Sequence, residues 1–308
     1  MGPERTREVG PSLRQRAGAL ALASPPLLLV AVFVGFPIVV AIAYSFGHIG
    51  GLNATVASIA KDQHTVGRWY EFTLGAYQQV FGEARFQRDL LVTVGVSVAT
   101  TVIVIVLAWG IALYVRLSDT WVARLLSALA VVPLFIPVVI ASWAILTFYA
   151  ADGFVRSIAS QVGLTAPVWG YTVTCILIGL VWTHLPFATL MVVSGVQAVP
   201  DALIEAARDA GASLPRAVLK VVAPLALVPT VIAGTFTAIG TLGSFTVPYF
   251  TGPNAPNMLG VDMANYFQSF NQPQSSVVMA VVVFVIAAGF GGVYVWANYR
   301  SAADTGRA

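Results

Sequence analysis

The segment Glu205-Ala206-Ala207-Arg208-Asp209-Ala210-Gly211 is short and charged, and it is enclosed by two long apolar stretches. The stretches 157–200 and 221–261 contain no Asp, Glu, Lys or Arg, and Pro224 follows Gly211 by thirteen residues. A helix that crosses a bilayer needs about 20 apolar residues, so each stretch is long enough for one membrane span. The segment therefore predicts a polar connection between two membrane helices.

This connection should itself be helical. Strong helix formers occupy nearly every position from 202 to 210. Asp201 is a good N-cap, or Pro200-Asp201 together form a helix start. Gly211 indicates a C-cap or a point of close backbone approach. An i, i+3, i+4, i+7 spacing defines one small-residue face, formed by Leu203, Ala206, Ala207 and Ala210. A helix that lies on the membrane surface would carry bulky aromatics and lysines there, so alanines favour a surface that docks a protein partner.

The composition of the whole chain excludes a soluble protein. Of its 308 residues, 58% are hydrophobic and only 9% are charged, whereas soluble domains average about 25% charged residues. The mean hydropathy is +0.83. The apolar runs are continuous and not divided into alternating segments of about ten residues, which favours helices over a β-barrel.

Charge-free stretches predict an all-α integral membrane protein with six transmembrane helices. The expected domain is 20–298, between an N-terminal tail (1–19) and a C-terminal tail (299–308). The apolar run of the first helix is too long for a secretory signal, so we expect it to be retained. The six predicted spans are 20–46, 90–115, 125–149, 171–197, 221–247 and 275–298.

The distribution of Lys and Arg predicts the orientation in the membrane. With six spans, eleven of these residues lie on the side of both termini and the 198–220 loop, and five lie on the other side. Both termini and the loop should therefore be cytoplasmic. The net charge of +3 is explained as a topology signal, and a nucleic-acid partner is not needed.

The loop resembles the cytoplasmic EAA loop of ABC importer permeases. That motif reads Glu-Ala-Ala, three residues, Gly, nine residues, Ile, one residue, Leu-Pro. Here Val221 replaces the isoleucine and Ala223 the leucine. The resemblance covers residues 86–298. Within the family, the chain looks most like the spermidine/putrescine-type permeases, which are relatives of the sugar, iron and sulfate permeases. This similarity lies in Trp182-Thr183-His184-Leu185-Pro186-Phe187 and Gly243-Ser244-Phe245-Thr246-Val247-Pro248.

The resemblance implies a type I importer fold in the bacterial inner membrane and a transport subunit that is not an enzyme. It implies that the cytoplasmic helix, 201–215, couples to an ABC ATPase dimer, that a second homologous permease completes the pathway, and that an extracytoplasmic binding protein delivers the substrate. The chain would bind no cofactor, and ATP and Mg would bind the partner, because no G-x-x-x-x-G-K-[ST] motif is present. The coupling residues would be Glu205, Ala206, Ala207, Asp209, Gly211 and Pro224.

The transported substrate is expected to be a small hydrophilic solute, polyamine-like or sugar. His184 is the ionisable residue placed well inside a predicted span, where it lines the pathway or hydrogen-bonds a carbonyl freed by Pro186. Further pathway candidates are Trp143, Tyr149, Trp182 and Thr183. No predicted span carries a carboxylate, and Asp152 and Asp262 lie near the outer ends of spans. This pattern weakens the polyamine reading without removing it, because selection by a binding protein stays open.

Several alternatives stay open at this point. A self-sufficient secondary transporter would need inverted repeats and several buried ionisable groups. The segment 258–270 could cap the pathway, contact an external partner, or anchor at the headgroups through Tyr266, Phe267 and Phe270. No metal site is expected, because His48 and His64 lack metal-ligand spacing. Cys175 is expected to be a packing residue.

Overall fold

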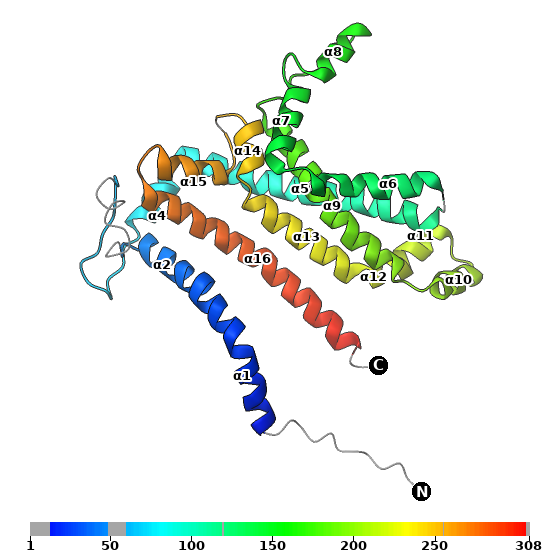
Figure 1. Ribbon diagram of the computed structural model, residues 1–308, viewed down its shortest axis with the longest axis horizontal. Coiled ribbons are helices and arrows are strands. Elements are labelled where there is room, and N and C mark those ends of the chain that lie inside the picture. Colours follow the sequence, from blue (N-terminus) through cyan, green and yellow to red (C-terminus); the bar gives the residue numbers. More distant parts are fainter. Residues whose placement is uncertain (1–12, 49–59, 119, 255, 306–308) are drawn as a thin grey trace.

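The computed structural model describes residues 13–48, 60–118, 120–254 and 256–305, and every regular element in these ranges is helical. Short π-helical or 3-10 turns occupy Ala31–Gly35, Val132–Phe135 and Val218–Val222. The α-helices in Figure 1 are α1 (Leu13–Val30), α2 (Phe36–Ser45), α4 (Gly75–Gly82), α5 (Ala84–Leu117), α6 (Trp121–Val131), α7 (Val138–Tyr149), α8 (Phe154–Gln161), α9 (Val173–Gln197), α10 (Asp201–Asp209), α11 (Leu214–Ala217), α12 (Ala223–Leu225), α13 (Leu227–Leu242), α14 (Thr246–Thr251), α15 (Leu259–Gln268) and α16 (Pro273–Thr305).

Four of the six predicted spans coincide with helices that are long and apolar enough to cross a membrane. They are α1 with α2, then α5, α9 and α16. The expected tails are partly helical, since α1 begins at Leu13 and α16 continues to Thr305. Residues 1–12 of the expected N-terminal tail lie outside the described residues.

Small side chains let the central helices pack closely. In α5, Val104, Ala108 and Ala112 recur every four residues and are buried. They meet a similar buried row in α9, formed by Ala188, Val192 and Val196. Small residues at such spacing allow two membrane helices to approach closely. The α5–α9 pair, with α13 against both, is therefore the centre of the bundle.

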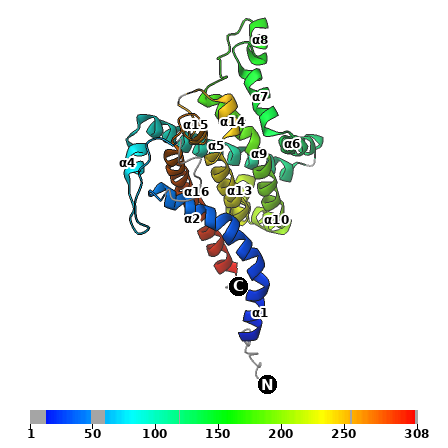
Figure 2. The ribbon, with the colours of Figure 1, turned by 60° about the vertical axis from the view of Figure 1, so that its left-hand side comes forward.

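The predicted third span, 125–149, is wrong as a single helix. Ile136 has an extended backbone (φ −103°, ψ 121°), and α7 begins only after Pro137. A residue before proline is disfavoured in the α conformation, which ends the helix there. The stretch long enough to span is instead Val138–Gln161, which includes α8. Figures 1 and 2 both show α7 and α8 projecting from the rest of the bundle.

The predicted fifth span, 221–247, is also displaced and broken. The segment that is apolar and long enough to span consists of two helical parts, Leu214–Leu225 and Leu227–Leu242. The two parts are bent by 69° relative to each other. The ring of Pro229 clashes with a helical carbonyl four residues earlier, at Leu225, and its nitrogen cannot donate a hydrogen bond. The bend therefore falls at Ala226, the residue between the two parts.

The helix directions define two ends of the bundle. Gln274 at the start of α16 donates to the Tyr44 carbonyl at the end of α2, and Arg85 at the start of α5 binds Asp262 of α15. We call this the α15 end. The end of α5 meets the start of α10 instead, through Arg116 and Asp201, and we call this the α10 end. Which end faces the cytoplasm stays a prediction of the charge distribution.

Candidate functional site: the α10 loop

Local backbone chemistry determines both ends of α10. Pro200 occupies the N-cap with an extended backbone (ψ 135°), and Asp201 is the first helical residue, not the N-cap. An acidic side chain in the first turn is favoured by the helix dipole. At the other end the Gly211 N–H donates to the Arg208 carbonyl, and the Ala212 N–H donates to the Ala207 carbonyl. This pair of bonds is a Schellman motif.

Gly211 is confirmed as the C-cap glycine. Its φ is +84°, in the left-handed region that favours glycine. A Cβ added to it would meet no atom within 4 Å, so close packing inside this chain is not the reason for a glycine. The helix predicted over 201–215 therefore ends at Asp209, and α11 starts a new direction at Leu214.

The small-residue face of α10 is divided between the protein and the solvent. Ala207 is half-buried, and Ile204, one turn before it on the same side, packs against the α5–α9 core. Leu203, Ala206 and Ala210 are exposed. The charged side chains in the second half of the helix, Glu205, Arg208 and Asp209, are exposed as well. The outward surface of α10 thus combines small apolar and charged groups.

A groove of about 330 Å³ lies between α10 and α11. Ala207, Ala210, Gly211 and Ala212 form one wall. The other wall is formed by Arg216, Ala217, Lys220 and Val221. One wall of the groove therefore consists of small residues. The other wall carries two cationic side chains, Arg216 and Lys220, which are exposed at the surface.

Arg116 fixes the start of α10 to the end of α5. Its guanidinium Nη2 lies 2.6 Å from the Asp201 carboxylate and 2.8 Å from the Val199 carbonyl oxygen. The Arg116 side chain is mostly buried, with 18% exposed. From the sequence, Arg116 is evident only as one of the charges that predict the topology. A cation in the last turn of one span and an acid at the start of the loop were the available signals.

The predicted coupling residues form one group with a single exception. Glu205, Ala206, Ala207 and Asp209 lie on α10, and Gly211 closes it. Pro224 lies in α12, just after the π-helical turn Val218–Val222, and is absent from the groove walls. Pro224 therefore lies just before the bend at Ala226 and does not line the groove.

Two of the predicted pathway residues share a hollow of about 390 Å³ between α7 and α9. Tyr149 and Trp182 line it with apolar side chains of α7. Trp143 lines an adjoining hollow of about 660 Å³, and its ring lies 5.9 Å from that of Phe250. Thr183 does not line either hollow and donates to the Gly179 carbonyl.

His184 does hydrogen-bond a carbonyl, but not the one that Pro186 frees. Its Nδ1 lies 3.1 Å from the Leu180 carbonyl oxygen, whereas the missing N–H of Pro186 would have paired with residue 182. Its ring packs on α13, where a Cβ added to Gly240 would lie 2.7 Å from Nε2. His184 lines neither of the hollows beside α7. Among the described residues, no group of three or more His, Cys, Asp or Glu could hold a metal ion.

The expectation that no span carries a carboxylate is wrong. Because α5 begins at Ala84, Asp89 lies within a membrane helix, and its side chain is buried. The predicted span started at residue 90, since the charges before it suggested a loop. Tyr266 is also buried and hydrogen-bonds Glu83, so it is not free to anchor at the headgroups as one reading of 258–270 required.

The chain belongs to the family of binding-protein-dependent transport system inner membrane components, the permease subunits of ABC importers, which it matches over residues 105–300. It is 24% identical to the sulfoquinovosyl glycerol transport system permease protein SmoG of Agrobacterium fabrum, over 92% of this chain and 90% of that protein. It is 28% identical to the spermidine/putrescine transport system permease protein PotB of Escherichia coli, over 61% of this chain and 68% of that protein.

Solved structures share the fold. A crystal structure of a bacterial ABC transporter involved in the import of the acidic polysaccharide alginate aligns with a TM-score of 0.68 and 15% identity. The alignment covers 91% of this chain and 96% of that one. A methionine ABC transporter in an inward-facing conformation aligns with a TM-score of 0.51 and 21% identity, over 68% of this chain and 94% of that one. The type I importer permease fold and the inner-membrane location are thereby confirmed.

Proposed function

We propose that this permease forms half of a solute pathway and that α10 couples it to an ATPase dimer. The observation that carries the proposal is the exposed surface of α10 beside the groove between α10 and α11. Small side chains admit a partner's surface closely, while Glu205, Asp209 and the two cations of the groove fix its orientation by charge.

ATP and Mg would bind to the partner ATPase and not to this chain. A second homologous permease would complete the pathway, and an extracytoplasmic binding protein would deliver the substrate. Two similar solved structures support such an assembly, because one is an ABC transporter of methionine and the other a bacterial alginate ABC transporter in complex with a periplasmic protein.

The proposed substrate is a small hydrophilic solute, either sugar-like or polyamine-like. The names of SmoG and PotB, the relatives described above, support the two classes. The aromatic rings of Tyr149 and Trp182 suit either class, since an aromatic face binds an ammonium group as well as an apolar face. The carboxylates of Asp89 and Asp262 at the α15 end are buried beside the Arg85 guanidinium, so they are poorly placed to bind a polyamine.

The test is purification of the tagged chain in mild detergent, followed by identification of every co-eluting protein. We expect an ATPase subunit and a second permease. Glu205→Lys should reduce the amount of ATPase recovered, because it reverses a charge on the docking surface. The control is Asp152→Lys, which reverses an exposed charge far from α10.

A homo-oligomer without an ATPase would contradict the proposal and favour a self-sufficient secondary transporter. Equal ATPase recovery from the Glu205→Lys variant and the wild type would contradict the docking role of α10 alone. Once a binding protein is identified, its binding of a polyamine and of a panel of sugars distinguishes the two substrate classes.

A further inference from the structure

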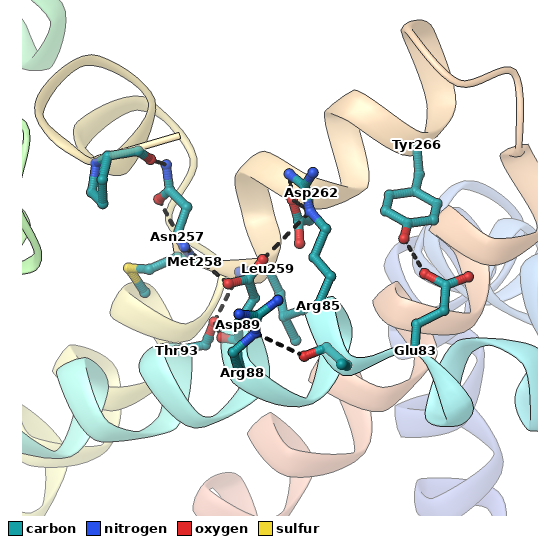
Figure 3. A network of polar contacts seen from close by, with 12 residues as sticks. Glu83, Arg85, Arg88, Asp89, Thr93, Asn257, Met258, Leu259, Asp262 and Tyr266 are labelled. Carbon is teal, nitrogen blue, oxygen red and sulfur yellow. Dashed lines mark hydrogen bonds and ion pairs between the residues drawn. The ribbon is translucent and has the colours of Figure 1, made fainter. Parts of the chain in front are cut away.

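Two carboxylates are buried beside a single arginine at the α15 end. Asp89 of α5 is 1% exposed and Asp262 of α15 is fully buried. Arg85, one helical turn before Asp89, reaches toward α15 (Figure 3). Its Nε and Nη2 donate to Oδ1 of Asp262 at 3.1 and 2.6 Å. Its Nε lies 3.7 Å from Oδ2 of Asp89, too far for a hydrogen bond.

Asp89 also holds the chain segment that leads into α15. Its Oδ1 accepts the Asn257 N–H at 3.0 Å. One turn along α5, the Thr93 hydroxyl donates to the Asp89 carbonyl and accepts the Leu259 N–H at 2.8 Å. Figure 3 shows these bonds side by side between α5 and the segment before α15. The position of α15 on α5 therefore depends on Asp89.

The second oxygen of each carboxyl has no partner. Oδ2 of Asp89 and Oδ2 of Asp262 are buried and accept no hydrogen bond. The same Nε of Arg85 lies 3.1 Å from Oδ1 of Asp262 and 3.7 Å from Oδ2 of Asp89, so both carboxyl groups border one guanidinium nitrogen. Burying an unpaired carboxylate costs far more than burying a neutral group. Two carboxylates with one guanidinium leave one negative charge uncompensated. Adjacent carboxyls resolve this problem by sharing one proton.

The neighbouring groups do not supply a second positive charge. Arg88 donates to the Ala84 carbonyl, and Glu83 hydrogen-bonds the Tyr266 hydroxyl. Burial and the bond to Glu83 raise the pKa of the Tyr266 phenol, so it stays neutral. From α16 the nearby contact is Ser276, which donates to the Met263 carbonyl. Among the described residues, Arg85 is thus the one cation that forms an ion pair with either carboxylate.

We propose that Asp89 and Asp262 form a proton-binding pair that fastens α15 to α5. The pair shares one proton between the two unpartnered Oδ2 atoms, while Oδ1 of Asp262 accepts both bonds from Arg85. A metal cation fits less well, because hard cations take six or more oxygen ligands, whereas the described residues offer two buried carboxylate oxygens without a partner here. The Arg85 side chain is 32% exposed, so solvent reaches the edge of the pair.

The pair makes stability depend on pH with a defined sign. The folded protein holds a proton that an unfolded aspartate would release, so the free energy of unfolding falls as pH rises through the range in which the buried proton is lost. Loss of the proton places two negative charges side by side and loosens α15 from α5. This property does not depend on ATPase docking.

The experiment is thermal unfolding of the full-length chain in detergent between about pH 5 and about pH 9. The wild-type midpoint should fall by about 4 °C or more over this range. Asp89→Asn should remove most of the fall, because the amide keeps the acceptor for Asn257 and its N–H replaces the shared proton. Asp152→Asn, at an exposed acid, is the control and should retain the wild-type dependence.

An Asp89→Asn variant with the wild-type pH dependence would overturn the proposal. If that variant does not fold, infrared spectra of the wild-type protein decide the matter. A protonated-carboxyl band that disappears at alkaline pH and is retained in the Asp152→Asn control supports the pair, and its absence at acid pH overturns it. Midpoints that respond to replacement of sodium by choline and not to pH would also overturn it, since a metal cation would then occupy the site.

Discussion

Gly211 determines how the chain leaves α10. Its positive φ is strained for any residue with a Cβ, at a cost of about 1–2 kcal/mol, while the space around it is open. Substitution therefore changes the backbone direction of the groove wall without creating a clash inside this chain. Asparagine visits this conformation more readily than other residues with side chains.

We expect Gly211→Leu to insert in the membrane normally but to separate ATP hydrolysis from transport. Its side chain would project from a position that we propose to face the ATPase. Gly211→Asn should retain more transport than the leucine variant. Both rates are measured in proteoliposomes that contain the whole importer. Normal transport by Gly211→Leu would contradict the docking model.

Arg116 makes two contacts of unequal value. The ion pair with Asp201 joins a mostly buried side chain to one that is 76% exposed, and exposed ion pairs contribute about 0–1 kcal/mol. The hydrogen bond to the Val199 carbonyl is charge-assisted, and such bonds contribute about 1.5–3 kcal/mol. Arg116→Ala should therefore lower the thermal midpoint more than Asp201→Ala does. If the two variants lower the thermal midpoint equally, the ion pair with Asp201, and not the bond to the Val199 carbonyl, accounts for the contribution of Arg116.

At the scale of the helices, Gly195 lets α9 pack closely against α13. A Cβ added to Gly195 would lie 2.7 and 2.8 Å from the ring carbons of Pro229, and a proline ring cannot rotate away. Gly195→Ala should therefore destabilise the protein by about 1–3 kcal/mol. The control is Gly95→Ala in α5, where no atom lies within 4 Å. Thermal unfolding of both variants in detergent tests the difference.

Proline explains most differences between the predicted and the observed helices. Charge-free stretches locate α5, α9 and α16 well, because burial in lipid permits few charges. They do not show where Pro137 ends a helix or where the helix containing Pro229 bends. A proline within an apolar run is compatible with a kink, a break or a first turn, and the choice depends on neighbouring helices.

The candidate site, like the helices, is predictable from the sequence in part. The α10 helix and its C-cap follow from local sequence, because helix formers and a glycine act over one or two turns. The contacts of Arg116 and Arg85 join residues that are 85 and 177 positions from their partners. No local pattern in the sequence predicts such pairs. The buried carboxylate pair was missed for this reason.

At the scale of the whole molecule, the orientation in the membrane can be tested with single cysteines. The natural Cys175 is fully buried, so it should give little background labelling. Trp69→Cys lies in an 86% exposed position at the α15 end, and Arg208→Cys is exposed on α10. In intact cells a membrane-impermeant maleimide should label Trp69→Cys alone. Labelling of Arg208→Cys before permeabilisation would reverse the predicted topology.

The length of α5 has a mechanical consequence. It runs for 34 residues, about 50 Å, without a proline, and each of its ends is tied by an arginine to a different short helix. A neighbouring helix with a break can change the angle between its two parts, whereas the unbroken α5 resists bending. It is therefore expected to move as one rigid element. We expect a tilt of α5 at its α10 end to displace its α15 end as well.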